Sequence, residues 1–256
     1  MTPPLSGKRA LVLGAAHGVG LACANELAAH GASVTAVYRA RPPDFAQAEV
    51  DRQAGLEWIC ADQTTERGFE TIMSACPDPD VLVIVPPRVP LGSGLDINLD
   101  AYRVAHESNC IAPLRFVLGM APRMRAQRFG RIVAISGAST KAPIPSHAAV
   151  NAARVALLAA ISGIAREIAS SNVTINAVLL GPTDTPGLVE RWQARAQERG
   201  IPYEQLFDES CARIPSGRLG RPQECAALCM LLCSPAMGHL TAQNILLDGG
   251  ATPGLF

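Results

Sequence analysis

The sequence predicts an α/β fold in which helices cover both faces of a parallel sheet. Short apolar runs, each long enough for one strand, alternate along the chain with longer segments whose apolar residues recur at helical spacing. Several runs are almost continuously apolar, as is typical of strands buried on both faces. The chain of 256 residues contains no linker-like stretch, charge run or repeat. We therefore expect residues 1–256 to form a single domain around a doubly wound parallel sheet of about seven strands.

The expected elements follow one another in a regular order. Strands are predicted at 10–13, 33–37, 56–60, 81–85, 131–136, 173–179 and 243–247. Helices are predicted at 18–30, 100–127, 147–170 and 222–233. Gly31 suits the end of the first helix, and Pro222 suits the first turn of the last one. Pro113 and Pro122 should bend or interrupt the second helix, because proline lacks the N–H that a helix interior needs.

Composition argues against several classes of partner. The 22 basic and 22 acidic residues balance, so the chain lacks the positive charge typical of proteins that bind nucleic acid or anionic membranes. The longest apolar runs are interrupted by Arg, Glu or Asn before they reach the length of a membrane span. Residues 1–9 contain no apolar signal core. A cytoplasmic protein with a small-molecule substrate is the expectation.

The eight cysteines are scattered and contain no C-x-x-C pair, which indicates reduced thiols. Cys225, Cys229 and Cys233 are spaced so that they share one helix face. Such a stripe fits either a packing face of small residues or part of a metal site. A metal site needs a fourth ligand and a different geometry, so we favour packing and predict no metal.

A glycine-rich turn joins the first strand to the first helix. Its spacing, G-x-x-x-G-x-G, places Gly14, Gly18 and Gly20 around His17 and Val19. Glycines allow a tight turn and a close approach of the backbone to a phosphate, and the helix N-terminus offers free N–H groups with a positive dipole end. In this strand–turn–helix context the turn predicts a dinucleotide pyrophosphate site, although a tight turn that binds nothing has the same spacing.

These features together resemble the short-chain dehydrogenase/reductase family over about residues 6–251. The family's T-G-x-x-x-G-x-G matches 13–20, with Leu13 in place of the threonine. The remaining matches follow in the family's order: Asp62, Asn109, Gly181 and Thr185 in 180–185, then 217–224 and 247–250. The resemblance implies a Rossmann-type fold. It implies that Asp62 contacts adenine, that Asn109 is structural and catalytic, and that Gly181 and Thr185 belong to the segment that closes over the nicotinamide.

Cofactor preference is read from the end of the second strand. A carboxylate there would bind the ribose hydroxyls of NAD, but this chain has Tyr38 followed by Arg39. Members of the family that bind NADP often carry arginine at this place and a basic residue in the glycine turn, where His17 stands. A guanidinium suits the 2′-phosphate, so we predict that NADP(H) is favoured over NAD(H), unless Arg39 is merely solvated. The loss of the family's threonine, and of its N-N-A-G segment at 84–87, leaves room for weak binding.

The resemblance breaks where the family has its Ser-Tyr-Lys catalytic residues. An ungapped register places Gly137, Val150 and Arg154 at those three positions. A shifted register would place His147 and Asn151 at the Tyr and Lys positions, but it needs a gap inside a helix. Valine cannot donate a proton, and arginine is a poor acid near neutral pH.

The candidate catalytic residues are therefore His147, Asn109 and Arg154. His147 lies one turn before Val150 and so faces the same side of the helix. Its ordinary pKa suits acid–base chemistry, although a capped or solvated histidine at the start of a helix fits the sequence equally well. Asn109 and Arg154 would place water, ribose or substrate.

Two classes of function remain open. The first is an atypical reductase or tailoring enzyme that acts on an already polarised small substrate, such as an activated alkene or an iminium, or that catalyses a step without redox chemistry. The second is a catalytically silent homologue that serves as a partner subunit of an active relative or as a nucleotide-responsive binding protein. The polar residues kept on the pocket side favour the enzyme. Alanines on several faces of 147–170 predict a homodimer or homotetramer in either case.

Overall fold

The computed structural model describes residues 2–40 and 55–254. Its seven-stranded sheet has the order β3-β2-β1-β4-β5-β6-β7, and every neighbouring pair is parallel. The strands are β1 (Arg9–Leu13), β2 (Ser33–Tyr38), β3 (Leu56–Cys60), β4 (Val81–Ile84), β5 (Gly130–Gly137), β6 (Val173–Leu180) and β7 (Asn244–Leu247). The predicted fold class is confirmed, and the order reverses between β1 and β4, where such sheets bind ligands.

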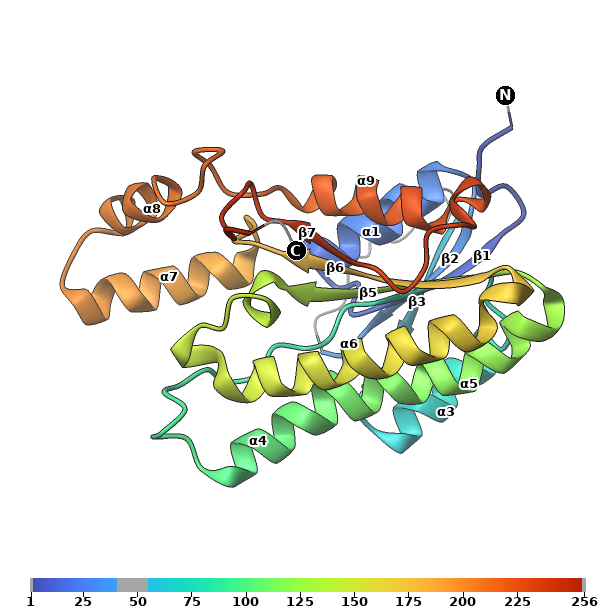
Figure 1. Ribbon diagram of the computed structural model, residues 1–256, viewed down its shortest axis with the longest axis horizontal. Coiled ribbons are helices and arrows are strands. Elements are labelled where there is room, and N and C mark those ends of the chain that lie inside the picture. Colours follow the sequence, from blue (N-terminus) through green and yellow to red (C-terminus); the bar gives the residue numbers. More distant parts are fainter. Residues whose placement is uncertain (1, 41–54, 255–256) are drawn as a thin grey trace.

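Helices cover both faces of the sheet, as Figure 1 shows. One core cluster joins the sheet to α1 (Gly18–Ala29) and α9 (Pro222–Cys233), and the other joins it to α3 (Glu66–Ala75), α5 (Ala112–Gln127) and α6 (Ala148–Ile168). Helices α7 (Pro186–Arg199) and α8 (Tyr203–Cys211) project beyond the sheet, at the left of Figure 1. The two helix layers cover the faces of the sheet, and α7 follows the carboxyl end of β6.

The helix predicted at 100–127 is divided in two. Helix α4 (Leu99–His106) leads into a π-helical turn (Glu107–Ile111), and α5 follows. Pro113 lacks the N–H that would bond the carbonyl of Asn109, and the N–H of Ala112 bonds Glu107, five residues earlier. At Pro122 the helix is not interrupted, since α5 continues through it. The carbonyl partner that Pro122 lacks belongs to Leu118, which is 56% exposed, so water can take its place.

The cysteine stripe of α9 is a packing face. Cys225, Cys229 and Cys233 are fully buried in the core cluster that also contains Cys23 of α1. The hydrogen bond with Cys23, together with burial, raises the pKa of the Cys225 thiol, which therefore stays protonated. Residues 145–171, which include α6, are apolar and long enough to cross a bilayer, but 44% of their most apolar window is buried inside the molecule. A core helix of an α/β domain has the same properties.

Candidate active site and cofactor cleft

The glycine turn after β1 has a geometry that only glycine satisfies. Gly14 and Gly18 have positive φ angles of 75° and 57°. A Cβ atom on Gly14 would collide with the carbonyl oxygen of Val85, and one on Gly20 would collide with that of Gly14. The turn therefore brings β1, the end of β4 and the start of α1 closer together than any side chain would permit.

The first turn of α1 faces this cleft without a side-chain cap. His17 is the N-cap residue, and its exposed side chain makes no capping hydrogen bond. The N–H groups at the start of α1, with the positive end of the helix dipole, are thus available to an anion. The cavity in front of them has a volume of about 510 Å³. Its walls are the glycine turn, the ends of β2 and β3, residues 85–88 after β4, and residues 185–191 at the start of α7.

Arg39 and Asp62 form the end of the cavity beyond β2 and β3. Their side chains pair at 3.6 Å, and the Arg39 side chain is 63% exposed. Asp62 also accepts hydrogen bonds from the backbone N–H and the hydroxyl of Thr64, at 2.9 and 2.7 Å. Burial alone would raise the pKa of Asp62, but the bonds from Thr64 and the charge of Arg39 outweigh burial and lower it. Asp62 is thus a fixed, ionised acceptor, and the Arg39 guanidinium remains accessible.

The opposite end of the cleft is organised by Asn109. This fully buried residue lies in the π-helical turn. Its Nδ2 donates to the carbonyl of Pro87 at 3.3 Å, and its Oδ1 accepts from Nε of Arg154 at 3.4 Å. Asn109 therefore connects the loop after β4, which lines the cavity, to a guanidinium on α6.

A family model described as "Enoyl-(Acyl carrier protein) reductase" matches residues 14–252 of the chain, from the glycine turn to the last loop. The chain belongs to the short-chain dehydrogenase/reductase family. It is 28% identical to 2,3-dihydroxy-2,3-dihydro-p-cumate dehydrogenase of Pseudomonas putida, over 97% of this chain and 96% of that one. It is also 28% identical to dehydrogenase/reductase SDR family member 6 of Rattus norvegicus, over 96% of this chain and 98% of that one. It is accordingly an oxidoreductase of this family.

Solved structures agree with this assignment. L-sorbose reductase from Gluconobacter frateurii, complexed with NADPH and L-sorbose, has a TM-score of 0.89 at 22% identity over all of both chains, a likeness in fold. A 3-oxoacyl (acyl-carrier-protein) reductase from Agrobacterium tumefaciens C58 with NADP bound has a TM-score of 0.84 at 26% identity, over 96% of this chain and 94% of that one. Such neighbours support a nicotinamide cofactor, and the uncapped α1 and glycine turn fit its pyrophosphate.

Thr185 and Gly181, two residues that the family pattern assigned to the cofactor, lie in different places. Thr185 lines the cavity, caps α7 by accepting from the N–H of Leu188 at 3.3 Å, and contacts Gly18 of the glycine turn. Gly181 is not among the residues that line the cavity. A Cβ atom there would lie 2.7 Å from the Cβ of Asp248, so Gly181 lets the segment after β7 approach. This close packing accounts for the glycine, and the cofactor contact that the resemblance implies stays a prediction.

Of the residues in the ungapped register, Gly137 at the end of β5 and Arg154 of α6 lie against each other. A Cβ atom on Gly137 would lie 2.9 Å from Nη1 of Arg154, so the guanidinium fills the space that a side chain at 137 would take. Val150 is only 3% exposed. Burial and the positive charge of Arg191 lower the pKa of Arg154 to about 10, which leaves it protonated at neutral pH. The site thus presents a fixed positive charge.

His147 also belongs to this end of the cleft. It precedes α6, is half-buried, and has Nδ1 3.1 Å from the hydroxyl of Ser146. Burial and the charges of Arg191 and Arg154 lower its pKa below the ordinary value of 6.5. The sequence led us to expect a suitable pKa without such a shift. The imidazole is instead mainly neutral at pH 7, so only a small fraction can act as an acid there. Asn151, from the shifted register, accepts from Ser139 at 2.7 Å in a buried pair.

Sequence reasoning missed two arginines of the site. Arg191 of α7 lines the cavity, and Arg88 crosses from the loop after β4 to α7. Nε of Arg88 lies 2.8 Å from the position of a Cβ on Gly187, and Nη1 pairs with Glu190 at 3.2 Å. Both arginines lie close in sequence to segments that the family resemblance had singled out. Arg88 directly follows 84–87, where the family has N-N-A-G, and Arg191 lies six positions after Thr185. Only the folded α7 brings them together.

Proposed function

We propose that the chain is an NADP(H)-dependent reductase of activated alkenes, in which hydride adds to an α,β-unsaturated carbonyl compound without help from a tyrosine acid. We use the ungapped register, in which Gly137, Val150 and Arg154 occupy the positions of the family's Ser, Tyr and Lys. A nicotinamide dinucleotide in the cleft would supply the hydride. The glycine turn and α1 would hold its pyrophosphate, with Asp62 at the adenine end and Thr185 near the nicotinamide.

The observation that carries this proposal is the position of Arg154. Its guanidinium fills the place of a side chain on Gly137 and is held by Asn109. A guanidinium that stays charged cannot release a proton readily, but it stabilises negative charge strongly when water is excluded. The site therefore suits a reaction in which charge develops on an oxygen and the proton arrives afterwards.

Reduction of an enone meets this requirement. Hydride forms a new C–H bond at the β-carbon, the C=C π electrons move toward the carbonyl, and the resulting enolate oxygen pairs with Arg154. The α-carbon then takes a proton from water or from His147. A simple ketone would instead give an alkoxide, which needs a proton as it forms. An iminium is disfavoured, because its positive charge would meet Arg154, Arg191 and Arg88.

The first test is consumption of NADPH against a panel of simple ketones and α,β-unsaturated carbonyl compounds. We expect activity to be confined to the unsaturated members. If no member of the panel is reduced while NADPH binds tightly, the alternative of a silent partner subunit or nucleotide-responsive protein is favoured instead.

Cofactor preference should depend on Arg39. Its exposed guanidinium stands at the end of β2, where the 2′-phosphate would lie, so we expect NADPH to bind more tightly than NADH. Arg39→Ala should weaken NADPH binding about tenfold or more and leave NADH binding nearly unchanged, because a charge-assisted bond contributes about 1.5–3 kcal/mol. Fluorescence titration measures both affinities, with Arg125→Ala as a matched surface control. Equal affinities of the unmodified protein for NADPH and NADH would contradict the assignment of Arg39 to the 2′-phosphate.

His147 should contribute to proton delivery chiefly at acidic pH. Because its pKa lies below 6.5, the protonated imidazole is lost as pH rises through that lowered pKa. A rate that uses it as an acid should therefore fall with rising pH. His147→Ala should lower the rate by about tenfold or more at the acid end and flatten the profile. The check is the pH dependence of kcat from about pH 5 to 8. A variant with the unmodified rate and profile would show that water alone supplies the proton.

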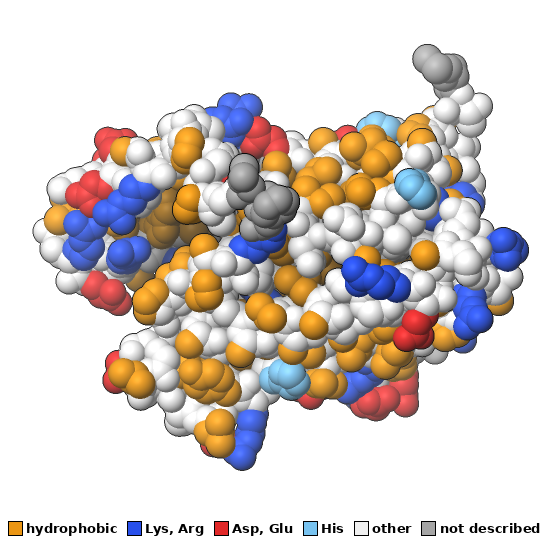
Figure 2. All heavy atoms as spheres, viewed as in Figure 1, with side chains coloured by type: hydrophobic (Ala, Val, Ile, Leu, Met, Phe, Trp, Pro, Cys, Tyr) orange, Lys and Arg blue, Asp and Glu red, His pale blue; other side chains and the backbone are white. Residues whose placement is uncertain are grey.

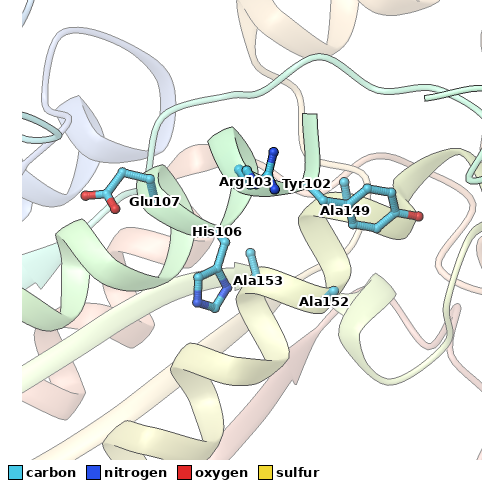
Figure 3. A pocket seen from close by; sticks show the side chains of 7 residues that line it. All are labelled: Tyr102, Arg103, His106, Glu107, Ala149, Ala152 and Ala153. Carbon is cyan, nitrogen blue, oxygen red and sulfur yellow. The ribbon is translucent and has the colours of Figure 1, made fainter. Parts of the chain in front are cut away.

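The proposed assembly is a dimer or tetramer of this chain, formed on the face of α4, α5 and α6. Val104, Leu118 and Val155 are 57, 56 and 47% exposed there. A hollow of about 350 Å³ opens between α4 and α6, with Tyr102 beside Ala149 and His106 near Ala153 (Figure 3). Hydrophobic side chains also gather over this part of the surface in Figure 2. Exposed apolar groups on adjoining helices fit a second copy of the same face.

Val155→Arg should convert this assembly to a monomer, because two copies would bring like charges into an apolar contact. Light scattering at micromolar concentration gives the mass, and Leu231→Arg on α9, where Leu231 is 46% exposed, is the matched control. A monomeric unmodified protein would contradict the homo-oligomer and favour assembly with a different, active chain.

A further inference from the structure

Three guanidinium groups from three separate elements converge beside the nicotinamide end of the cleft. Arg154 comes from α6, Arg191 from α7, and Arg88 from the loop between β4 and α4. Arg88 and Arg191 both line the cavity, and Arg154 is connected to its wall through Asn109 and the Pro87 carbonyl. Figure 2 shows the surface hollowed between the lobe of α7 and α8 and the body of the protein.

The positive charges in this cluster are not balanced. Glu190 pairs with Arg88, whereas the Arg154 side chain has, among the residues that the structure describes, a single hydrogen bond, from Nε to the neutral amide oxygen of Asn109. Within residues 2–40 and 55–254, the Arg191 side chain makes no hydrogen bond or ion pair. The arginines consequently repel one another. Burial and Arg191 lower the pKa of Arg154, and burial and Arg88 lower that of Arg191.

An unbalanced, partly buried cluster of this kind is costly to the folded protein unless an anion completes it. Phosphate groups of the cofactor are one source of negative charge in the same cleft. In the proposed function, however, these phosphates have other binding groups, because the start of α1 would hold the pyrophosphate and Arg39 would hold the 2′-phosphate. Arg154 stands at the end of β5, two strands from the glycine turn in the sheet order, or about 10 Å.

We infer that the substrate is an organic anion whose carboxylate is held by Arg191, with its unsaturated carbonyl directed at Arg154. The inference rests on the proposed function and names the class of substrate that this site takes. Arg191 is suited to the carboxylate because it lines the cavity and its guanidinium has no partner in the described part of the chain. Arg154 is suited to the carbonyl because Asn109 and the surface of Gly137 hold it in place. A planar guanidinium binds a carboxylate through two parallel hydrogen bonds.

The inference is tested by binding rather than by turnover. Isothermal titration calorimetry with 4-oxopentanoate and with its methyl ester compares an anion with a neutral molecule of nearly the same shape. Each is titrated into the unmodified protein with and without NADP⁺. We expect the affinity for the carboxylate to be at least about tenfold higher than that for the ester. The ester cannot form the charged hydrogen-bond pair with the guanidinium. Arg191→Met should abolish that preference, and Arg125→Met, a substitution of an exposed arginine on α5, should leave it intact.

Several results would overturn the inference. They are equal binding of acid and ester, absence of binding by the acid, and a preference that survives Arg191→Met. A loss of NADP⁺ affinity in Arg191→Met with an unchanged preference would assign Arg191 to a cofactor phosphate instead. Failure of the proposed function is a different outcome, because the titration without nucleotide can show the carboxylate preference even when NADPH is never consumed.

Discussion

Replacing Gly137, Val150 and Arg154 together by serine, tyrosine and lysine should raise simple ketone reduction by about 10²–10⁴-fold, the usual contribution of general acid catalysis. The three changes belong together. A side chain on Gly137 would start 2.9 Å from Nη1 of Arg154, so Gly137→Ser alone would push the guanidinium aside. Lysine in place of Arg154 removes that conflict, and tyrosine in place of Val150 supplies the phenol that the proposed register lacks.

The gain is measured as the rate of NADPH oxidation with a panel of ketones. A second combination with phenylalanine in place of Val150 is the matched control, since it adds the ring without the hydroxyl. Val150 is 3% exposed, so both combinations must accommodate extra volume, and their melting temperatures should be compared. A folded tyrosine combination that reduces ketones no faster than the phenylalanine one would contradict the register on which the account depends.

Arg154→Met should lower kcat for an α,β-unsaturated carbonyl substrate by about 10²–10³-fold, as removal of one oxyanion-stabilising donor does in other enzymes. Arg154→Lys keeps the charge but not the planar donor and should recover part of the loss. The pH dependence follows from the lowered pKa of about 10. The positive charge is fully present well below that value, so the contribution of Arg154 to the rate should be constant there and be lost as pH rises through about 10.

Measuring stability beside kcat separates a role of Arg154 in stabilising negative charge from a role in folding. Arg154 is held by one hydrogen bond of 3.4 Å to Asn109, so its loss should cost little stability. Melting temperature and NADPH affinity of Arg154→Met should therefore stay close to those of the unmodified protein. An unchanged kcat would refute the assignment of Arg154 to the developing negative charge.

Much of the fold was accessible from the sequence because apolar periodicity reports burial directly. The seven strands appear within one or two residues of the predicted positions, and α9 has the predicted bounds. Helices α3, α7 and α8 were not predicted. Each has only two or three buried residues, so few positions of its sequence report burial. The sequence left open whether the helix continues through Pro122, because it does not show that Leu118 faces solvent.

The site was only partly predictable for a related reason. Glycines such as Gly14 and Gly20 are visible in a sequence because their spacing follows from the geometry of the turn. Arg191 and Arg88 gave no such signal, since an arginine in a polar segment looks solvated until the fold shows what surrounds it. The pKa of His147 also depends on arginines that only the folded chain brings near. The close packing of Gly181 against Asp248 likewise becomes visible only in the folded chain.

The central claim is that this cleft delivers hydride to a polarised double bond and lacks the acid that ketones need. It is tested most directly by kcat/KM for a saturated ketone and for its α,β-unsaturated counterpart, measured as NADPH oxidation under identical conditions. We expect the unsaturated compound to be reduced at least about 10²-fold more efficiently, with reduction at the C=C bond, because only the ketone depends on the acid that the proposed register lacks. Turnover of the saturated ketone near about 10 s⁻¹, a typical enzyme value, would contradict the account.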